Sequence, residues 1–277
     1  MAININDFFD LNLDKKENII TELKKKYSFL TPKQQTNLYQ LIDLAVEFKQ
    51  IPDQIQSKDI SALPLEKQIL PLLQKWLNNN VNSITTRNNA RLAKPFSDKD
   101  TVEDPALAHM LSTYFKVDNY DLTGDCGVEQ HLQSHQILMA IENIQGHLLE
   151  EYIASVICGD PFNFLWCDGQ TIKAADFCKR IDIHGEPSLL RLIQIKNKYN
   201  TENSSSSKIR EDTPIVIWYR LGKKKIDKKN VPDYKWDDLN NAVEGITGHN
   251  PDLSEEKYLN FLENIITHNP KIFYNEA

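Results

Sequence analysis

The spacing of apolar residues divides the chain into a helical first part and a mixed second part. Apolar residues at three- and four-residue intervals, typical of amphipathic helices, predict helices over residues 15–27, 31–48, 63–78, 103–115, 134–157, 234–243 and 254–268. Thr31-Pro32 is a strong start signal, because Thr caps a helix N-terminus and Pro fits the first turn. Short runs of β-branched and other apolar residues predict strands over 173–183, 189–197 and 213–221.

The first two predicted strands form a β-hairpin, because the intervening His184-Gly-Glu-Pro-Ser188 contains turn-forming residues. A loop centred on Glu186 would place Asp176 opposite Lys196. Side chains alternate between the two faces of a strand, so Asp176, Gln194 and Lys196 are predicted to share one face. A slip of one residue in this register would separate them.

These residue types indicate metal-assisted hydrolysis of a phosphodiester. A carboxylate at a strand end binds Mg²⁺ through its oxygens. The bound metal polarises a phosphate and activates a water, and a neighbouring Lys stabilises the developing negative charge. Asp176, Gln194 and Lys196 together resemble the motif of the PD-(D/E)XK nucleases. The chain departs from that motif in having Gln194 where an acid is usual, and Ala175 where Pro is usual.

The predicted helix before the hairpin also resembles this family. It carries a Gly146-x-x-x-Glu150 pattern, which places Glu150 in the family's helix-borne acid position, with Glu151 as the competing residue. The resemblance implies an Mg²⁺ cofactor held by Asp176, Gln194, Glu150 and the backbone carbonyl of Ile195. It also implies four catalytic residues, namely Asp176, Gln194, Lys196 and Glu150.

The polar segment after the hairpin is similar to the corresponding segment of the SinI-like type II restriction enzymes, which cut GG(A/T)CC. Amide, hydroxyl and basic side chains of this kind read bases and bind phosphates. The predicted DNA-binding residues are Asn197, Lys198, Tyr199, Asn200, Thr201, Asn203, Ser204, Ser205, Ser206, Lys208 and Arg210. A flexible linker is the alternative interpretation of the Ser run. The similarity is clear over about residues 134–221, and it implies a separate cognate methyltransferase.

Composition and charge are compatible with a DNA partner. The net charge is −7, but residues 173–229 carry fourteen Lys or Arg against seven Asp or Glu, a local excess of seven positive charges. A polyanion needs a locally positive surface, not a positive total. Four cysteines without a Cys-x-x-Cys pair, no signal peptide and no apolar run long enough to span a bilayer predict a bacterial cytoplasmic protein.

Three further polar segments have ordinary interpretations. Residues 79–91 are predicted to be a loop, with DNA contact by their Arg and Asn side chains as the second interpretation. The charged run 222–229 is predicted to be a solvated loop, with a phosphate clamp as the second interpretation. Cys126, His131 and His135 have no evident fourth ligand, so no zinc site is predicted.

We therefore predict an α/β protein with a restriction-endonuclease-like core, in which helices flank a mixed central sheet. Residues 126–277 would form the nuclease core and residues 1–125 a helical region that supports the core, grips DNA or forms a dimer surface. Cleavage of both strands at a near-palindromic site implies a homodimer acting on double-stranded DNA. Two alternatives remain open: a repair-type nuclease of the same fold, and an inactive DNA-binding protein on that fold.

Overall fold

A computed structural model describes the chain over residues 2–3, 21–22, 25–48, 55–56, 58–64, 67–68, 71–72, 74–78, 81–82, 106, 109–110, 113, 126–167, 172, 174–198 and 215–268. The chain forms two units, residues 1–86 with 150–257, and residues 87–149 with 258–277. The boundary predicted between residues 125 and 126 stays a prediction. In the part of the chain that is described, no helix is long and apolar enough to cross a membrane.

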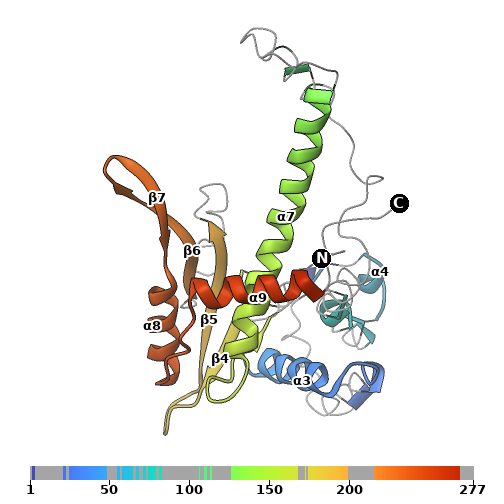
Figure 1. Cartoon of the computed structure of the whole chain (residues 1–277). Helices are drawn as coiled ribbons and strands as arrows, with labels where there is room; N and C mark the ends of the chain where they lie inside the picture. The colour runs from blue at the N-terminus through green and yellow to red at the C-terminus, as the bar shows by residue number, and fades with distance from the viewer. Residues whose placement is uncertain are drawn as a thin grey trace. The chain divides into compact units, whose positions relative to one another are not determined.

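A five-stranded mixed sheet is the centre of the first unit (Figure 1). Its strands are neighbours in the order in which they occur along the chain. They are β3 (Leu165–Trp166), β4 (Phe177–Ile181), β5 (Leu189–Lys198), β6 (Ile215–Ile226) and β7 (Lys229–Tyr234). The β5–β6 pair is parallel and the other three pairs are antiparallel. The predicted α/β class with a mixed central sheet is confirmed.

The β4–β5 hairpin forms as predicted, but its register differs by two residues. Phe177 pairs with Ile193, so continuing the ladder by one residue places Asp176 opposite Gln194 and not opposite Lys196. The turn is centred on Gly185, whose φ of 81° lies in the left-handed region that glycine adopts without strain. The turn was predicted to centre on Glu186, one residue later, and this prediction was wrong because the left-handed residue is Gly185. A two-residue shift preserves the alternation of faces.

The charged run 222–229 forms the end of β6, a turn and the start of β7, so the predicted loop is wrong. β6 continues to Ile226 and pairs with Lys229 at the start of β7. The two residues between them, Asp227 and Lys228, have φ values of 50° and 65°. Positive φ at both central residues is the conformation of a two-residue turn that matches strand twist. β7 also occupies Tyr234, where a helix was predicted to begin.

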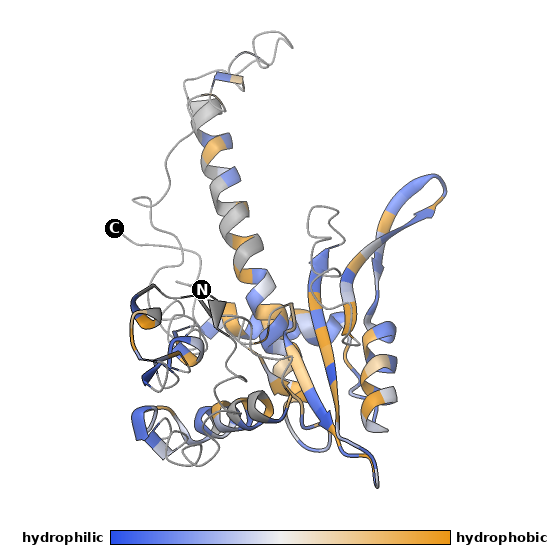
Figure 2. Ribbon diagram, turned by 180° about the vertical axis from the view of Figure 1, so that it is seen from behind, coloured by the Kyte–Doolittle hydropathy of each residue, from blue (hydrophilic) through white to orange (hydrophobic). Residues whose placement is uncertain are grey.

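An N-terminal helical layer packs on one face of β4 and β5. Its helices include α3 (Pro32–Glu47) and α4 (Lys58–Ser61), and β1 (Ala2–Ile3) pairs with β2 (Ile55–Gln56). Leu190 and Leu192 of β5 belong to the same buried cluster as Leu38, Leu41 and Trp76. Burial of these side chains provides most of the free energy that holds the layer to the sheet. Figure 2 shows the resulting apolar character of the central strands.

The opposite face of the sheet is covered by α8 (Trp236–Thr247) and the beginning of α9 (Glu255–His268). Trp218 of β6 packs against Trp236, with ring centroids 4.9 Å apart. Tyr152, near the end of α7 (Cys126–Ile157), meets Trp236 edge to face at 5.7 Å. The helix predicted over 134–157 is α7, which begins earlier, at Cys126. The helix predicted over 254–268 is α9, which begins one residue later than predicted.

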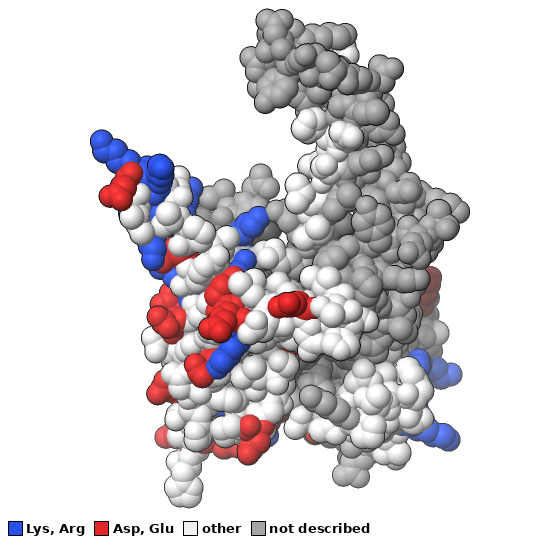
Figure 3. Space-filling view, in the orientation of Figure 1, with Lys and Arg blue, Asp and Glu red and all other residues white. Residues whose placement is uncertain are grey.

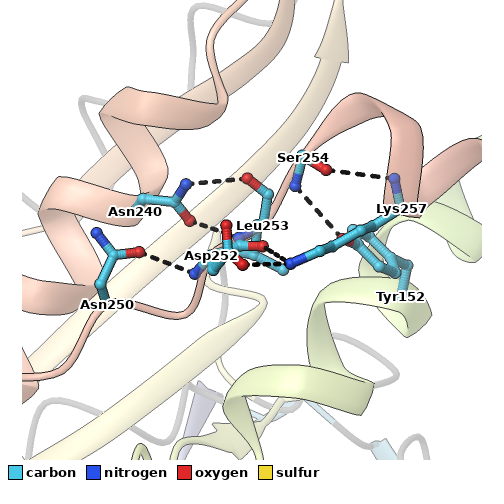
Figure 4. Close-up of polar contacts among 7 residues, drawn as sticks. All are labelled: Tyr152, Asn240, Asn250, Asp252, Leu253, Ser254 and Lys257. Atoms are coloured by element: carbon cyan, nitrogen blue, oxygen red, sulfur yellow. Dashed lines mark hydrogen bonds and ion pairs between the residues drawn. The ribbon is translucent and has the colours of Figure 1, made fainter.

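The turn between α8 and α9 is held by side-chain hydrogen bonds (Figure 4). Asn240 donates from Nδ2 to the Leu253 carbonyl and accepts from the Leu253 amide at Oδ1, both at 2.9 Å. Ser254 caps α9, because its Oγ accepts from the Lys257 amide at 3.3 Å. These contacts satisfy backbone groups that the helix ends leave without intrahelical partners. They fix the position of the first turn of α9.

Thr31 and Gln34 form a reciprocal capping box at the start of α3, which confirms the predicted start signal. We predict that Thr31→Ala lowers the free energy of unfolding by about 1 kcal/mol, because an orphan backbone donor loses its partner. Urea denaturation followed by circular dichroism measures the change. Thr36→Ala is the matched control, since Thr36 is exposed within the same helix. An equal loss in both variants would contradict the capping role.

Candidate active site

Asp176 is fixed on three sides at the point where the β4 ladder stops. Its amide donates to the Ile193 carbonyl at 2.9 Å, and its own carbonyl accepts from the Cys167 amide at 2.7 Å. Its carboxylate Oδ2 accepts from the Ile195 amide at 2.6 Å. Ala174, with φ 58°, departs from strand geometry, and the Asp176 carboxylate takes the place of a ladder acceptor for the Ile195 amide. These bonds bracket Gln194 from both sides.

Gln194 presents an oxygen whose environment suits a cation or a water. The side chain is half-buried and lies on the face of β5 that Asp176 adjoins. Its Oε1 atom is buried and has no hydrogen-bond partner among the described residues. A buried acceptor without a partner costs about 1–3 kcal/mol. An oxygen in this position, beside a carboxylate, is a suitable ligand for a hard divalent metal ion.

Lys196 lies two residues beyond Gln194 on the same face of β5. Two residues of a strand advance about 7 Å, which is close to the length of an extended lysine side chain. Lys196 is half-buried and Lys198, the next residue on this face, is exposed. The structure thus brings together the three residues of the predicted motif. Their alignment follows from the strand register and not from the predicted opposition of Asp176 and Lys196.

The helix-borne acids lie within the last two turns of α7. Glu150 and Glu151 are both half-buried, and Oε2 of Glu151 is buried. Either carboxylate offers the hard oxygen that a divalent ion prefers. Within the described part of the chain, no group of three or more His, Cys, Asp or Glu side chains is placed to hold a metal. A donor set at Asp176 would therefore combine at most two such side chains with neutral oxygens, such as those of Gln194 and the Ile195 backbone.

The thiol of Cys167, whose backbone amide binds Asp176, is not a candidate nucleophile. Cys167 is buried, and burial together with the neighbouring Cys178 and Asp176 raises its pKa well above the usual value. A thiol with a raised pKa stays protonated at neutral pH, and only the thiolate is an effective nucleophile. Cys167 therefore contributes its backbone amide to Asp176 and leaves the chemistry to the oxygen and nitrogen groups.

Asn197 has a different position from the other predicted DNA-contacting residues. It follows Lys196 and so points to the opposite face of β5, where its Oδ1 accepts from Arg220 Nε at 2.8 Å. Arg220 is buried and donates through NH1 to Glu255 Oε1 at 2.5 Å. Glu255 also accepts from Trp236 Nε1 at 2.8 Å. The Asn197 side-chain oxygen therefore joins β5 to β6 and, through Arg220 and Glu255, to α9, and its predicted contact with DNA stays a prediction.

Sequence reasoning missed this network, although one signal was present. Arg220 is a charged residue within the otherwise apolar strand Ile215–Leu221, and a buried cation requires a partner. Residues 199–210, which include the remaining predicted DNA contacts except Lys198, lie outside the described residues. Lys198 lines a cavity of about 860 Å³ over β6, together with Tyr219, Leu221 and Lys223.

Comparison with known proteins identifies the family of the chain. Residues 71–268 match the SinI restriction endonuclease family. The type II restriction enzyme SinI of Salmonella infantis is 34% identical over 179 residues, which cover 65% of this chain and 68% of SinI. The type II restriction enzyme Eco47I of Escherichia coli is 34% identical over 177 residues, or 64% and 67% of the two chains. The chain belongs to the SinI restriction endonuclease family.

Membership of the SinI family confirms the resemblance found around the hairpin and extends it beyond residues 134–221. A SinI-family restriction endonuclease is a site-specific deoxyribonuclease, so the predicted enzyme class is confirmed. The family implies DNA as the substrate and indicates a divalent metal cofactor. The oxygens of Asp176 and Gln194 fit such an ion, because one belongs to a carboxyl group and the other is a buried acceptor without a described partner.

Removal of Glu255 tests the buried network that supports the SinI-family core. We predict that Glu255→Ala lowers the free energy of unfolding by about 3 kcal/mol or more, because Arg220 would stay buried without its carboxylate. Glu256→Ala is the control, because Glu256 is exposed in the same helical turn and should change stability by less than about 0.5 kcal/mol. Chemical denaturation of both variants measures this. Similar losses would show that Glu255 acts only through the helix dipole.

Proposed function

We propose that this restriction endonuclease cleaves double-stranded DNA at GG(A/T)CC in an Mg²⁺-dependent reaction centred on Asp176, Gln194 and Lys196. The observation that carries the proposal is the bracketing of Gln194 by the two hydrogen bonds of Asp176, with Lys196 next on the same face. The recognition sequence is supported by the resemblance to the SinI-like group. Family membership supports the reaction class.

The proposed metal sphere uses Asp176 Oδ1, Gln194 Oε1, the Ile195 carbonyl and Glu150, with Glu151 as the alternative acid. When bound there, Mg²⁺ supplies polarisation of the phosphate and a water of lowered pKa. The Ile195 amide keeps the Asp176 carboxylate in one orientation, so little side-chain freedom remains to be lost on binding. The neutral Gln194 contributes an oxygen without adding charge, so a second acid from α7 completes the sphere.

Lys196 acts on the phosphate side of the proposed reaction. Its ammonium group donates hydrogen bonds to the attacking water and to the phosphate oxygens, where negative charge increases in the transition state. Its half-buried position reduces screening by solvent, which strengthens this interaction. The residues proposed to contact DNA remain Asn197, Lys198, Tyr199, Asn200, Thr201, Asn203, Ser204, Ser205, Ser206, Lys208 and Arg210.

The symmetry of the proposed site determines the assembly. GG(A/T)CC is nearly palindromic, so hydrolysis of both strands is best served by two copies of the active site related by a two-fold axis. We therefore propose a homodimer. A separate methyltransferase would protect the host's own copies of the site, and a bacterial cytoplasmic location would give the enzyme access to invading DNA.

Lys196→Ala tests the catalytic assignment. We expect the variant to lose at least about 100-fold in cleavage rate, because transition-state charge is left without its cation, while it still binds DNA. Plasmid digestion with Mg²⁺, resolved on a gel, measures the rate. Lys224→Ala is the control, because this exposed lysine lies on the opposite face of the sheet.

The same digestion separates the alternatives. Discrete fragments whose ends map to GG(A/T)CC support a restriction enzyme, whereas a smear or structure-specific nicking indicates a repair-type nuclease. Equal cleavage by the wild type and by Lys196→Ala would contradict the assignment of Lys196. Failure of the wild type to cleave with Mg²⁺ or Mn²⁺ would indicate an inactive DNA-binding protein.

Substitutions at Gln194 test its role as a metal ligand. Gln194→Glu should lower the Mg²⁺ concentration needed for half-maximal cleavage, because a charged oxygen binds a hard cation more strongly than an amide oxygen. Gln194→Ala should raise that concentration. Cleavage rates across an Mg²⁺ titration measure both. If Gln194→Ala left the titration curve unchanged, Gln194 would not be a ligand.

A further inference from the structure

The β6–β7 hairpin concentrates positive charge in a chain that is acidic overall. Residues 222–235 contain six lysines and two aspartates, whereas the whole chain carries a net charge of −7. In the space-filling view, Lys and Arg side chains gather on the projecting end of this hairpin (Figure 3). Figure 2 shows the same end as hydrophilic. Such a cluster repels itself, and a polyanion would relieve that repulsion.

Strand register sorts these lysines between the two faces of the sheet. Lys196 pairs with Tyr219 and Lys198 with Leu221, and paired residues share a face. Continuing along β6 by steps of two residues, Lys223 and Lys225 project from the same face as Gln194, Lys196 and Lys198. Lys224 projects from the opposite face, as does Lys229, which pairs with Ile226. The hairpin therefore extends the basic row of the active-site face.

The lysines on the two faces also differ in their ion pairs. Lys224 lies 3.7 Å from Asp233, and Lys235 lies 2.6 Å from the same carboxylate. Lys235 holds the pKa of Asp233 below its usual value, so the carboxylate remains charged at neutral pH. Among the described residues, Lys223 and Lys225 form no ion pair. Both are exposed, so their charge is available to a ligand.

A hollow lies between the hairpin and the end of β5. Lys198 and Lys223 line the same cavity of about 860 Å³, to which Tyr219 and Leu221 also contribute, as do Trp218 and Lys235. From Tyr219, level with Lys196, to Lys225 the strand advances six residues, or about 20 Å. Double-stranded DNA rises about 3.4 Å per base pair, so the row has the length of about six base pairs.

We propose that Lys223 and Lys225 of the β6–β7 hairpin bind the phosphate backbone of double-stranded DNA beside the cleaved site. This proposal rests on the proposed function, because the row begins at the catalytic Lys196. The contacts are electrostatic and independent of base sequence, since lysine binds phosphate without reading base edges there. They hold the flanking duplex along the sheet face that carries the reacting groups.

The test compares two double variants that remove the same charge from opposite faces. The variants are Lys223→Gln/Lys225→Gln and Lys224→Gln/Lys229→Gln. Each full-length protein is tested for binding to two duplexes of about 30 base pairs, one with a GG(A/T)CC site and one without. Binding is measured in EDTA over a range of KCl concentrations. Loss of phosphate contacts should reduce the slope of log affinity against log salt by about 0.9 per contact, or about 1.8 per protomer for the first variant.

The first variant should also weaken binding to the two duplexes by the same factor, because phosphate contacts carry no base information. The second variant should keep the wild-type slope, and Lys223→Arg/Lys225→Arg should restore it in the first. Equal changes in both double variants, or no change in the first, would overturn the proposal. Circular dichroism of each variant confirms that the fold is retained.

Plasmid cleavage by the wild type with Mg²⁺ separates this proposal from the function on which it rests. Cleavage at GG(A/T)CC together with an unchanged slope would reject the hairpin contacts alone. The expected change in slope without any cleavage would reject the proposed function and retain the hairpin as a DNA-binding surface. If the wild type did not bind DNA at all, both proposals would be wrong.

Discussion

The hydrogen bond from the Ile195 amide to the Asp176 carboxylate is the contact on which the site depends. It takes the place of a bond of the β4–β5 ladder, next to Ala174, whose φ of 58° departs from strand geometry. Together with the backbone bond to Ile193, it aligns the acid with Gln194. The carboxylate is thus oriented by the sheet itself, and a metal ion or phosphate would meet a group that is already ordered.

The two faces of the sheet divide structural and functional roles. Along β5, Leu190 and Leu192 pack under the N-terminal helical layer, and Gln194, Lys196 and Lys198 then follow on the same face. The polar residues begin where the apolar cluster ends. On the opposite face, burial continues through aromatic and charged contacts with α8 and α9. The sheet is therefore anchored on both faces while one stretch of one face remains polar.

Charge is distributed according to burial. Within the core, Arg220 is neutralised by Glu255, as a buried guanidinium requires, because an unpaired buried charge is costly. On the exposed hairpin, Lys223 and Lys225 form no ion pairs among the described residues, and contact with solvent stabilises their charges. A net charge of −7 therefore says little about the partner, since the local excess of lysine lies beside the proposed active-site face.

Local patterns were enough to predict α3, the β4–β5 hairpin and the shared face of Asp176, Gln194 and Lys196. The shared face survived a two-residue error in register, because the side to which a strand residue points depends only on alternation. The register itself was decided by the left-handed turn at Gly185. The β6–β7 hairpin was missed, since consecutive lysines have no apolar alternation and only pairing with β7 makes them a strand. Periodicity is a property of neighbouring residues, whereas register, strand partners and the burial of Arg220 depend on contacts between residues far apart in the chain.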